Sequence, residues 1–450
     1  MNPPAGTALV VWTRRSWGPP RVMRSVRRPR YHTILVDTCV GNDKEGFVFP
    51  RGEDKWAGRD DDLDTSFRAS AITERGCSMK IIRVEPIPLH LPFASPFKIS
   101  HGEARETLEV LIVRIHTDEG IVGVGETQAW RRQGSAETLV NLVHTVQDHF
   151  EPILLGRSPF DISGTLHALN EAMYNTLYAQ AAVGDALYDI VGRALGVPVH
   201  VLLGGECRNR VRIGAILSMK PTVEELIDSA EAAYERGFRH FGLKIGVDPA
   251  VDVKNVAALR TRFGDRIVLR VDANGALSYD AALALLRKLE PYDIDVAEQP
   301  VAIWDLAGLA ALSRATTIPI MVDESVSTEH SLLEVIRQRA ATVVQTKIAK
   351  NGGIYRVNRL WHLAAAAGMR IFPGNHPSTS IATAAVAHIC GAWPGPLMEG
   401  PFAVGRCGSL ATDIVTNPIV PEDGEIAVPT APGLGVELDM DRIAALRVDV

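Results

Sequence analysis

Cysteine is scarce in this sequence, with five residues in 450, and this scarcity excludes two kinds of protein. The five are odd in number, widely spaced and outside any CxxC or CxxH pattern; they are Cys39, Cys77, Cys207, Cys390 and Cys407. Neither a disulfide framework nor a zinc site has that distribution. Scattered cysteines of this kind are typical of the reducing cytoplasm, which is the location that we predict.

An excess of positive charge is lacking too. Lys and Arg number 47 against 53 Asp and Glu, which gives a formal net charge of −6. Such a chain has no overall field to hold a polyanion, so we expect no nucleic-acid partner. Apolar runs such as 363–368 are far shorter than the ~20 residues that cross a bilayer, and we expect no membrane span. The length allows about three domains, or fewer where one is an α/β barrel.

Residues 1–78 show no sustained hydrophobic periodicity. Positions 1–32 carry seven arginines and no acidic residue, and an acidic cluster follows at Asp60, Asp61, Asp62 and Asp64. The pair Arg14-Arg15 is followed by prolines rather than by the apolar segment of a twin-arginine signal. We predict a disordered leader over residues 1–78, with an organelle transit peptide or a basic arm as the alternative.

From residue 79 onward the pattern becomes regular. Strand-like runs lie at 81–89, 108–116 and 121–126, and helical periodicity follows at 136–150, 162–176 and 181–195. Strands followed by helices predict an α+β domain. The pair Gly123 and Gly125 has no third glycine at the spacing of a dinucleotide-binding turn, so a dinucleotide fold is not expected.

A strand and helix unit repeats after residue 210. The strand candidates are 211–217, 240–244, 267–272, 296–298, 318–323, 342–347, 369–372 and 397–399, with helical stretches between them at 223–236, 281–289 and 332–339. Strands that alternate with helices in this way are parallel and joined by right-handed crossovers. Continuous apolar strands need both faces covered, so the pattern predicts a closed TIM-like barrel.

An ionisable residue ends five of these strands, at intervals of 24 to 28 residues: Lys244, Asp272, Glu298, Asp323 and Lys347. In a parallel barrel the carboxyl ends of the strands share one mouth, so we expect the five side chains to gather there. Three carboxylates in one mouth repel each other unless a cation lies among them. Oxygen ligands of this kind suit Mg²⁺ or Mn²⁺. For any one carboxylate alone, a salt bridge or a helix cap is the alternative.

Several linked motifs occur between about residue 79 and the last residue: Asp185-Ala186-Leu187-Tyr188-Asp189, Leu202-Leu203-Gly204-Gly205, Val271-Asp272-Ala273-Asn274, Ala297-Glu298-Gln299-Pro300, Val322-Asp323-Glu324-Ser325, Lys347-Ile348-Ala349-Lys350-Asn351-Gly352-Gly353 and Pro432-Gly433-Leu434-Gly435-Val436. With these motifs the sequence resembles the enolase superfamily, and within it the muconate lactonizing enzyme (muconate cycloisomerase) subgroup.

The resemblance implies a (β/α)₇β barrel over residues 206–404, with a capping domain made from residues 79–205 and 405–450. It also implies that Asp272, Glu298 and Asp323 bind the metal ion, with Asn274 and Glu324 supporting these ligands from behind. The activity it implies is Mg²⁺-dependent removal of a proton α to a carboxylate, through an enediolate, on a small-molecule carboxylate substrate. A homo-oligomer is expected.

The chemistry explains the residue types. An α proton is too weakly acidic for an amine to remove unless a Lewis acid stabilises the charge that forms on the carboxylate. Lys244 and Lys347, on opposite faces of the substrate, are then the acid and the base. A muconate-type cycloisomerase is the leading hypothesis. A racemase or epimerase of N-acylated amino acids, a hydroxy-acid dehydratase, and a catalytically silent scaffold remain alternatives.

Four further residues are candidate substrate contacts. Gly242 stands where the subgroup has the first lysine of Lys-x-Lys, which removes a positive charge beside Lys244 and opens space in the mouth. Glu399 ends the eighth strand, where a strand-end salt bridge is an equal alternative. His376 follows the seventh strand. Lys98 lies on a loop of the capping domain, where a solvated lysine is the alternative.

Overall fold

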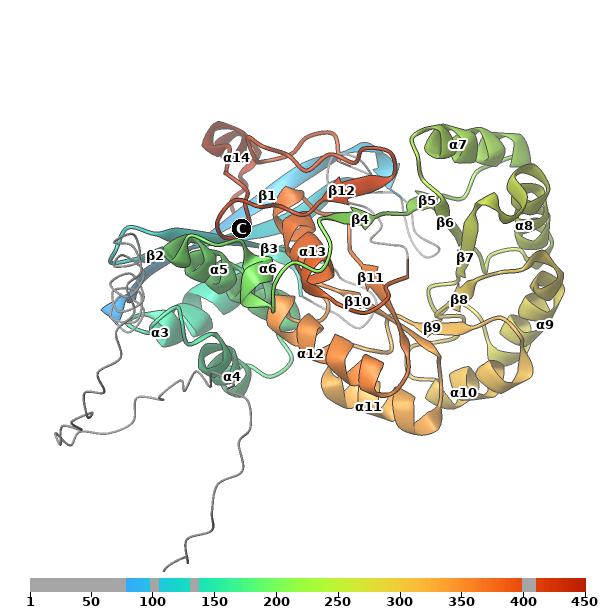
Figure 1. Ribbon diagram of the computed structural model, residues 1–450, viewed down its shortest axis with the longest axis horizontal. Coiled ribbons are helices and arrows are strands. Elements are labelled where there is room, and N and C mark those ends of the chain that lie inside the picture. The colour runs from blue at the N-terminus through green and yellow to red at the C-terminus, as the bar shows by residue number, and fades with distance from the viewer. Residues whose placement is uncertain (1–77, 98–104, 130–136, 399–409) are drawn as a thin grey trace, which may run out of the picture. The chain divides into compact units, whose positions relative to one another are not determined.

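The structure, a computed structural model, describes residues 78–97, 105–129, 137–398 and 410–450 (Figure 1). Three predictions therefore lie outside the described residues: the leader, apart from Ser78, and the substrate contacts Lys98 and Glu399.

The first part of the chain forms an antiparallel sheet in the order β1-β2-β3. Its strands are β1 (Ile81–Phe97), β2 (Arg105–Thr117) and β3 (Val122–Gln128). A tight turn joins β2 to β3, where the Thr117 hydroxyl donates to the Ile121 carbonyl at 2.9 Å and Gly120 takes a φ of +80°. The predicted meander is present at nearly the predicted positions.

Five helices follow this sheet in the chain, and α2, α3 and α5 pack on it: α2 (Leu139–His144), α3 (Glu151–Leu154), α4 (Ile162–Ala172), α5 (Leu177–Leu195) and α6 (Val199–Leu202). The long helix α5 packs directly on β3. A Cβ added to Gly123 or Gly125 would meet the carbonyl oxygens of Ala186 and Ala182. The two glycines therefore let a helix approach a strand closely, and they serve packing rather than nucleotide binding.

Seven parallel strands follow, in the order β11-β10-β9-β8-β7-β6-β5. They are β5 (Ala215–Leu217), β6 (His240–Lys244), β7 (Val268–Asp272), β8 (Val296–Glu298), β9 (Ile320–Val322), β10 (Val343–Lys347) and β11 (Arg370–Gly374). The helices that lie between and after them are α7 (Val223–Glu235), α8 (Pro249–Phe263), α9 (Tyr279–Leu289), α10 (Leu306–Ala315), α11 (Glu329–Gln338), α12 (Gly353–Ala366) and α13 (Ser380–Ala392). Figure 1 shows the curled sheet with these helices along its outer side, and the predicted TIM-like barrel with a capping domain is confirmed.

Two strand predictions differ in detail. The run 211–217 divides into β4 (Arg210–Arg212), which pairs antiparallel with β12 (Glu425–Ala427), and β5, which alone joins the barrel sheet. The division follows from a partner more than 200 residues away, which no local pattern reveals. At the eighth run, the Met398 amide donates to the Ile371 carbonyl at 2.9 Å, so this segment lies beside β11.

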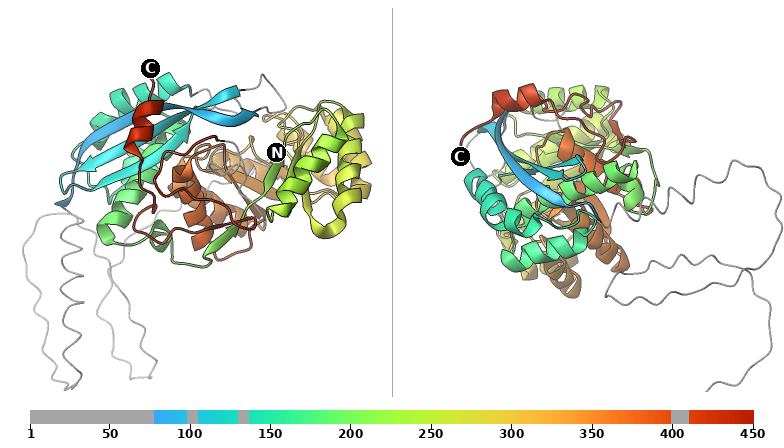
Figure 2. Two further views of the ribbon diagram at one scale, coloured as in Figure 1. Left: turned by 90° about the horizontal axis from the view of Figure 1, so that it is seen from above. Right: turned by 90° about the vertical axis from the view of Figure 1, so that its left-hand side faces the viewer.

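The last described residues return to the first strand. Leu89 pairs with Arg447, and the Val448 amide donates to the Pro88 carbonyl at 3.1 Å. Figure 2 shows α14 (Met440–Leu446) lying across β1. These contacts support the predicted contribution of residues 405–450 to the capping domain, while the boundaries at 205 and 404 stay predictions.

Two buried carboxylates of the capping domain join it to helices of the barrel. Glu126 on β3 accepts hydrogen bonds from the amides of Thr379 and Ala382, at 2.9 and 3.0 Å, where α13 begins. Asp185 on α5 accepts one from the Ile354 amide, at 2.8 Å, where α12 begins. A carboxylate at a helix N-terminus satisfies amides that have no partner within the helix, so both joints are capping interactions between domains.

No helix in the described part of the chain is both long enough and apolar enough to span a bilayer.

Candidate active site

The five ionisable residues predicted from their spacing lie at one edge of the parallel sheet. Lys244, Asp272, Glu298 and Lys347 are the last residues of β6, β7, β8 and β10, and Asp323 directly follows β9. The register pairs Lys244 with Asp272, and Asp272 with Glu298. The carboxylates thus occupy the three middle strands, and a lysine stands on each side of them.

On the β6 side, Lys244 and Asp272 form a hydrogen-bonded group with Asn274. The Lys244 ammonium donates to Asp272 Oδ2 at 2.5 Å and to Asn274 Oδ1 at 2.8 Å. The Asn274 amide side chain donates to Glu324 Oε1 at 3.0 Å, and its backbone amide donates to Asp272 Oδ1 at 2.8 Å. Asn274 therefore orients both carboxylates, and its role in supporting metal ligands stays a prediction.

On the β10 side, Asp323 lies between two ammonium groups. Lys347 Nζ is 2.5 Å from Asp323 Oδ2, and Lys350 Nζ is 3.0 Å from Asp323 Oδ1. Burial favours the neutral acid, but the two ammonium groups outweigh it and hold the pKa of Asp323 well below its usual range. Lys350 also donates to the Val326 carbonyl at 2.8 Å. The sequence analysis gave Lys350 no role, although it stands inside the quoted motif.

Glu298 is paired with a residue that the sequence analysis did not identify. Its carboxylate forms an ion pair with Arg270, two residues before Asp272 on β7, and accepts from the Gln345 side chain at 2.7 Å. Arg270 is 3% exposed, and burial lowers the pKa of its guanidinium to about 10. Its position was readable from the sequence, because residues two apart on a strand face the same side.

The space expected beside Gly242 is filled. A Cβ added to Gly242 would lie 3.1 Å from Arg270 Cζ and closer still to a guanidinium nitrogen. The absence of the first lysine of Lys-x-Lys therefore opens no volume in this part of the mouth, because the side chain of Arg270 on the neighbouring strand fills it. The guanidinium of Arg270 also supplies a positive charge in place of the lysine. This corrects the expectation of an opening at Gly242.

The donor set fits a divalent cation in its chemistry. Three carboxylates lie on adjacent strands, and the Glu324 Oε2 atom is buried with no hydrogen-bond partner among the described residues. Burial, and then the charges of Asp323 and Asp272, raise the pKa of Glu324 to about 7. Within the same part of the chain, no three acidic, histidine or cysteine side chains already converge as ligands. Each predicted ligand is instead paired with an ammonium or guanidinium group, with which a metal ion would compete.

Gln299, Gly352 and Gly353 shape the backbone around these groups. Gln299 takes a φ of +35°, and its side-chain oxygen accepts from the amides of Asp323 and Ser325, at 3.1 and 3.2 Å. Gly352 and Gly353 have φ values of +79° and +86°, and a Cβ on Gly353 would lie 2.8 Å from Asp185 Oδ1. Glycine at this turn lets α12 start against α5, directly after the segment that carries Lys347.

His376, the substrate contact predicted after the seventh strand, is buried beside the β10 half of the site. Its ring stacks on that of Tyr178 from α5, with centroids 5.9 Å apart. Burial, reinforced by the nearby charge of Lys347, lowers the pKa of His376 well below its usual range, so the imidazole is neutral. Tyr178 was missed because an aromatic residue in an apolar helix is indistinguishable by sequence from a core residue.

The geometry is that of a capped barrel with a lysine on each side of three carboxylates, and comparisons with known proteins identify its class. The mandelate racemase / muconate lactonizing enzyme N-terminal domain matches residues 81–204, and the enolase C-terminal domain-like model matches residues 225–442. The chain therefore belongs to the mandelate racemase / muconate lactonizing enzyme family, and the predicted membership of the enolase superfamily is confirmed.

Individual relatives agree with this assignment. Muconate cycloisomerase 1 of Rhodococcus opacus is 34% identical over 81% of this chain and 98% of its own length. The N-succinyl-L-Arg/Lys racemase of Bacillus cereus is 31% identical over 82% of this chain and 98% of its own length. The structure of the muconate lactonizing enzyme from Pseudomonas fluorescens in complex with muconolactone is 29% identical, with a TM-score of 0.77 over 82% of this chain and all of that one. These relatives are isomerases, and the chain is an isomerase of the same superfamily.

Proposed function

We propose that this protein moves a proton at the carbon α to a substrate carboxylate, and that Lys244 and Lys347 are its acid and base. The observation that carries the proposal is the position of the two lysines. They end β6 and β10, with the three carboxylate-bearing strands between them, and each donates to one of those carboxylates at 2.5 Å. A substrate held over the carboxylates would therefore meet one amine on each face.

Asp272, Glu298 and Asp323 are the residues that would hold Mg²⁺ or Mn²⁺ in this mouth. Such an ion supplies Lewis-acid stabilisation of the charge that develops on a carboxylate when its α proton leaves. The other contributions come from the chain. Asn274 orients Asp272 and Glu324, and Gln345 orients Glu298. Lys350 balances the charge of Asp323, so that Lys347 is not needed for that balance and is available for proton transfer.

The leading activity is that of a muconate-type cycloisomerase. In the lactonizing direction, a carboxylate oxygen adds to a double bond and a lysine ammonium delivers a proton to the carbon α to the other carboxylate. In the reverse direction the lysine removes that proton and the carbon–oxygen bond breaks. Only one lysine needs to transfer a proton in this reaction, while the second can serve as a cation near the substrate.

Racemisation or epimerisation is the second candidate, because the site has an amine on both sides of the carboxylates. One lysine removes the α proton from one face and the other returns a proton to the opposite face. Relatives of the chain include the N-succinyl-L-Arg/Lys racemase and an L-Ala-D/L-Glu epimerase of Bacillus subtilis, which is 32% identical over 80% of the chain. Substrates of these kinds and muconolactone share an α proton beside a carboxylate.

Hydrogen–deuterium exchange separates these activities. The full chain is incubated in D₂O with Mg²⁺ and, in turn, muconolactone, both enantiomers of N-succinyl-arginine, and L-Ala-L-Glu, and exchange is followed by NMR. Exchange in muconolactone with formation of muconate supports the cycloisomerase. Exchange in both enantiomers of an amino-acid derivative supports the racemase. Absence of exchange across a wide panel of carboxylates, together with no divalent-ion binding, would establish the silent scaffold instead.

Three finer expectations belong to the same proposal. The substrate is a small carboxylate, the assembly is a homo-oligomer, and the compartment is the cytoplasm. The free thiols of Cys207 and Cys390 are consistent with a reducing compartment. Light scattering on the purified chain measures the assembly directly.

A further inference from the structure

Tyr178 presents a buried hydroxyl to the proposed active site. The residue lies in the first turn of α5, is 2% exposed, and its hydroxyl has no hydrogen-bond partner among the described residues. Buried hydroxyl groups in folded proteins are almost always paired, because a lost hydrogen bond to water is not otherwise replaced. A buried hydroxyl without a partner in the protein, when it lies beside an active site, indicates a group that pairs with a bound ligand.

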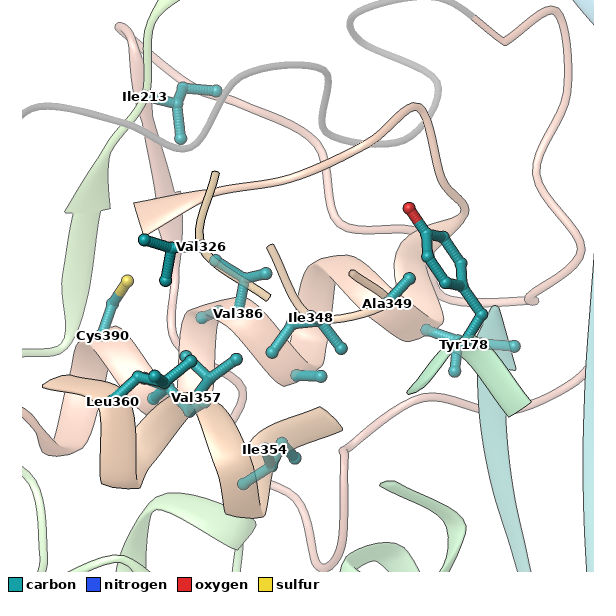
Figure 3. Packing of buried hydrophobic residues seen from close by; sticks show 14 of the residues in the cluster. Tyr178, Ile213, Val326, Ile348, Ala349, Ile354, Val357, Leu360, Val386 and Cys390 are labelled. Atoms are coloured by element: carbon teal, nitrogen blue, oxygen red, sulfur yellow. The ribbon is translucent and has the colours of Figure 1, made fainter. Parts of the chain in front are cut away.

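The neighbours of Tyr178 lie on the Lys347 side of the mouth. The Tyr178 ring stacks on His376 with an interplanar angle of 22°. In the view of Figure 3, the Tyr178 ring lies at the same end of the drawn cluster as Ala349, which stands between Lys347 and Lys350 in sequence. The carboxylates of Asp323 and Glu324 are also close enough to act on the tyrosine electrostatically.

The first turn of α5 holds the ring in a fixed position. Glu137 accepts hydrogen bonds from the amides of Tyr178 and Ala179, at 3.1 and 3.2 Å, so the amides at this helix start are satisfied by a side chain of the capping domain. The stack on His376 fixes the ring from the other side. A donor held in this way needs little reorganisation when a substrate arrives.

The chemistry of the pair restricts what it can bind. Burial raises the pKa of Tyr178 well above its usual value, with further contributions from Asp323, Glu137 and Glu324, so the hydroxyl keeps its proton and can donate it. The imidazole of His376 is neutral. Two neutral polar groups suit an uncharged acceptor, whereas a second carboxylate would favour a cation as its partner.

We propose that the Tyr178 hydroxyl binds substrate, donating a hydrogen bond to an uncharged oxygen, such as the carbonyl of an amide or a lactone, that the substrate carries beyond its α carboxylate. The inference rests on the proposed function, because that function brings a carboxylate substrate into this mouth. Muconolactone, the lactone form in the cycloisomerase reaction, and N-acylated amino acids both carry such an oxygen, so the hydroxyl can be tested with either kind of compound. Tyr178 would be a specificity-determining residue contributed by the capping domain.

The test compares Tyr178→Phe with Tyr188→Phe in the full chain. Both tyrosines lie on α5 and are buried, and the charged or titratable groups that act on Tyr188 are Asp185 and Tyr355 rather than the carboxylates of the mouth. We expect Tyr178→Phe to raise KM, and the Kd for muconolactone or N-succinyl-L-arginine, by about tenfold or more, with a smaller change in kcat. Mn²⁺ affinity and the circular dichroism spectrum should match those of wild type. Tyr188→Phe should change none of these quantities.

An acceptor-deletion experiment gives a second readout. L-arginine lacks the acyl carbonyl of N-succinyl-L-arginine, so its weaker binding should be the same for wild type and Tyr178→Phe. Equal KM and Kd values for Tyr178→Phe and wild type, in a chain that exchanges α protons, would overturn this inference alone. A wild-type chain that neither binds nor exchanges any carboxylate of the panel would overturn the proposed function, and the inference with it.

Discussion

Lys244 and Lys347 have different surroundings although both end a parallel strand. Lys244 shares its ammonium between Asp272 and the neutral oxygen of Asn274. Lys347 bonds to Asp323, which a second ammonium, that of Lys350, already balances. Removing Lys347 therefore leaves Asp323 paired, whereas removing Lys244 leaves Asp272 without its cation. The two lysines should consequently differ in how far their loss disturbs the metal site.

Lys347→Ala tests the proposed proton transfer with little disturbance of the carboxylates. We expect kcat to fall by about 10²- to 10⁴-fold, the usual contribution of a positioned acid or base. Divalent-ion affinity, measured by isothermal titration, should stay near the wild-type value because Lys350 still pairs with Asp323. Lys288→Ala, at an exposed position of α9, is the matched control. Retention of full activity would remove Lys347 from the mechanism.

Gly242→Lys tests the contact between β6 and β7. The new side chain would occupy the space of the Arg270 guanidinium and displace it from Glu298. Forcing extra atoms into a packed site costs about 1 to 3 kcal/mol, so we expect lower stability in urea unfolding and a higher KM. The double variant with Arg270→Met should lose less stability than the two single changes added together. Strict additivity, or unchanged kinetics in Gly242→Lys, would show that the two residues do not compete.

At the scale of elements, helix starts carry the contact between the capping domain and the barrel. Helix α12 begins against α5, where Asp185 accepts from the Ile354 amide. Burial, with a contribution from the charge of Glu126, raises the pKa of Asp185 to about 7 from its ordinary 3.8. The folded state therefore holds this proton more tightly than the unfolded chain does.

The consequence is a pH dependence with a definite sign. The stability that Asp185 gains from its proton is fully present below pH ~4 and is lost as the pH rises through about 7. Asp185→Asn keeps an acceptor for the Ile354 amide but cannot ionise. The difference in free energy of unfolding between this variant and wild type should therefore shift in favour of the variant from pH 4.5 to pH 8, by an amount on the order of a few kcal/mol. Urea unfolding at both pH values measures it. Asp228→Asn, at an exposed position of α7, should show the same pH dependence of unfolding as wild type. The same pH dependence in Asp185→Asn would contradict the raised pKa of Asp185.

Elements were predictable where their signal is local. The strand ends at Lys244, Asp272 and Lys347 follow from apolar runs that close on a charged residue. The pairing of β4 with β12 does not, because the two strands lie more than 200 residues apart in sequence. The Arg270 guanidinium in the space at Gly242, and the Tyr178 hydroxyl beside the mouth, also depend on neighbouring strands and helices. The spacing of charged residues in the sequence can therefore predict that they share one edge of the sheet. It does not predict which side chains they pair with there.

At the scale of the whole molecule, a metal ion would bind the folded chain and not the unfolded one, since the three carboxylates come from separate strands. Mg²⁺ or Mn²⁺ at 100 times its Kd should raise the free energy of unfolding by about 2.7 kcal/mol. Differential scanning calorimetry with and without EDTA measures the shift. Asp272→Asn should abolish most of it together with the metal-dependent activity, and Asp228→Asn should preserve both. An unchanged melting temperature at saturating ion would contradict the metal site.

The return of the last residues to β1 also has a consequence for biosynthesis. Residues 88 and 89 find their partners only at 447 and 448, on the far side of the barrel sequence. A ribosome-bound chain can already have completed every parallel strand while its first strand still lacks these neighbours. The capping domain therefore reaches its final set of contacts only after translation has passed those positions, and a product that ends before them would contain the seven described parallel strands but lack these contacts of β1.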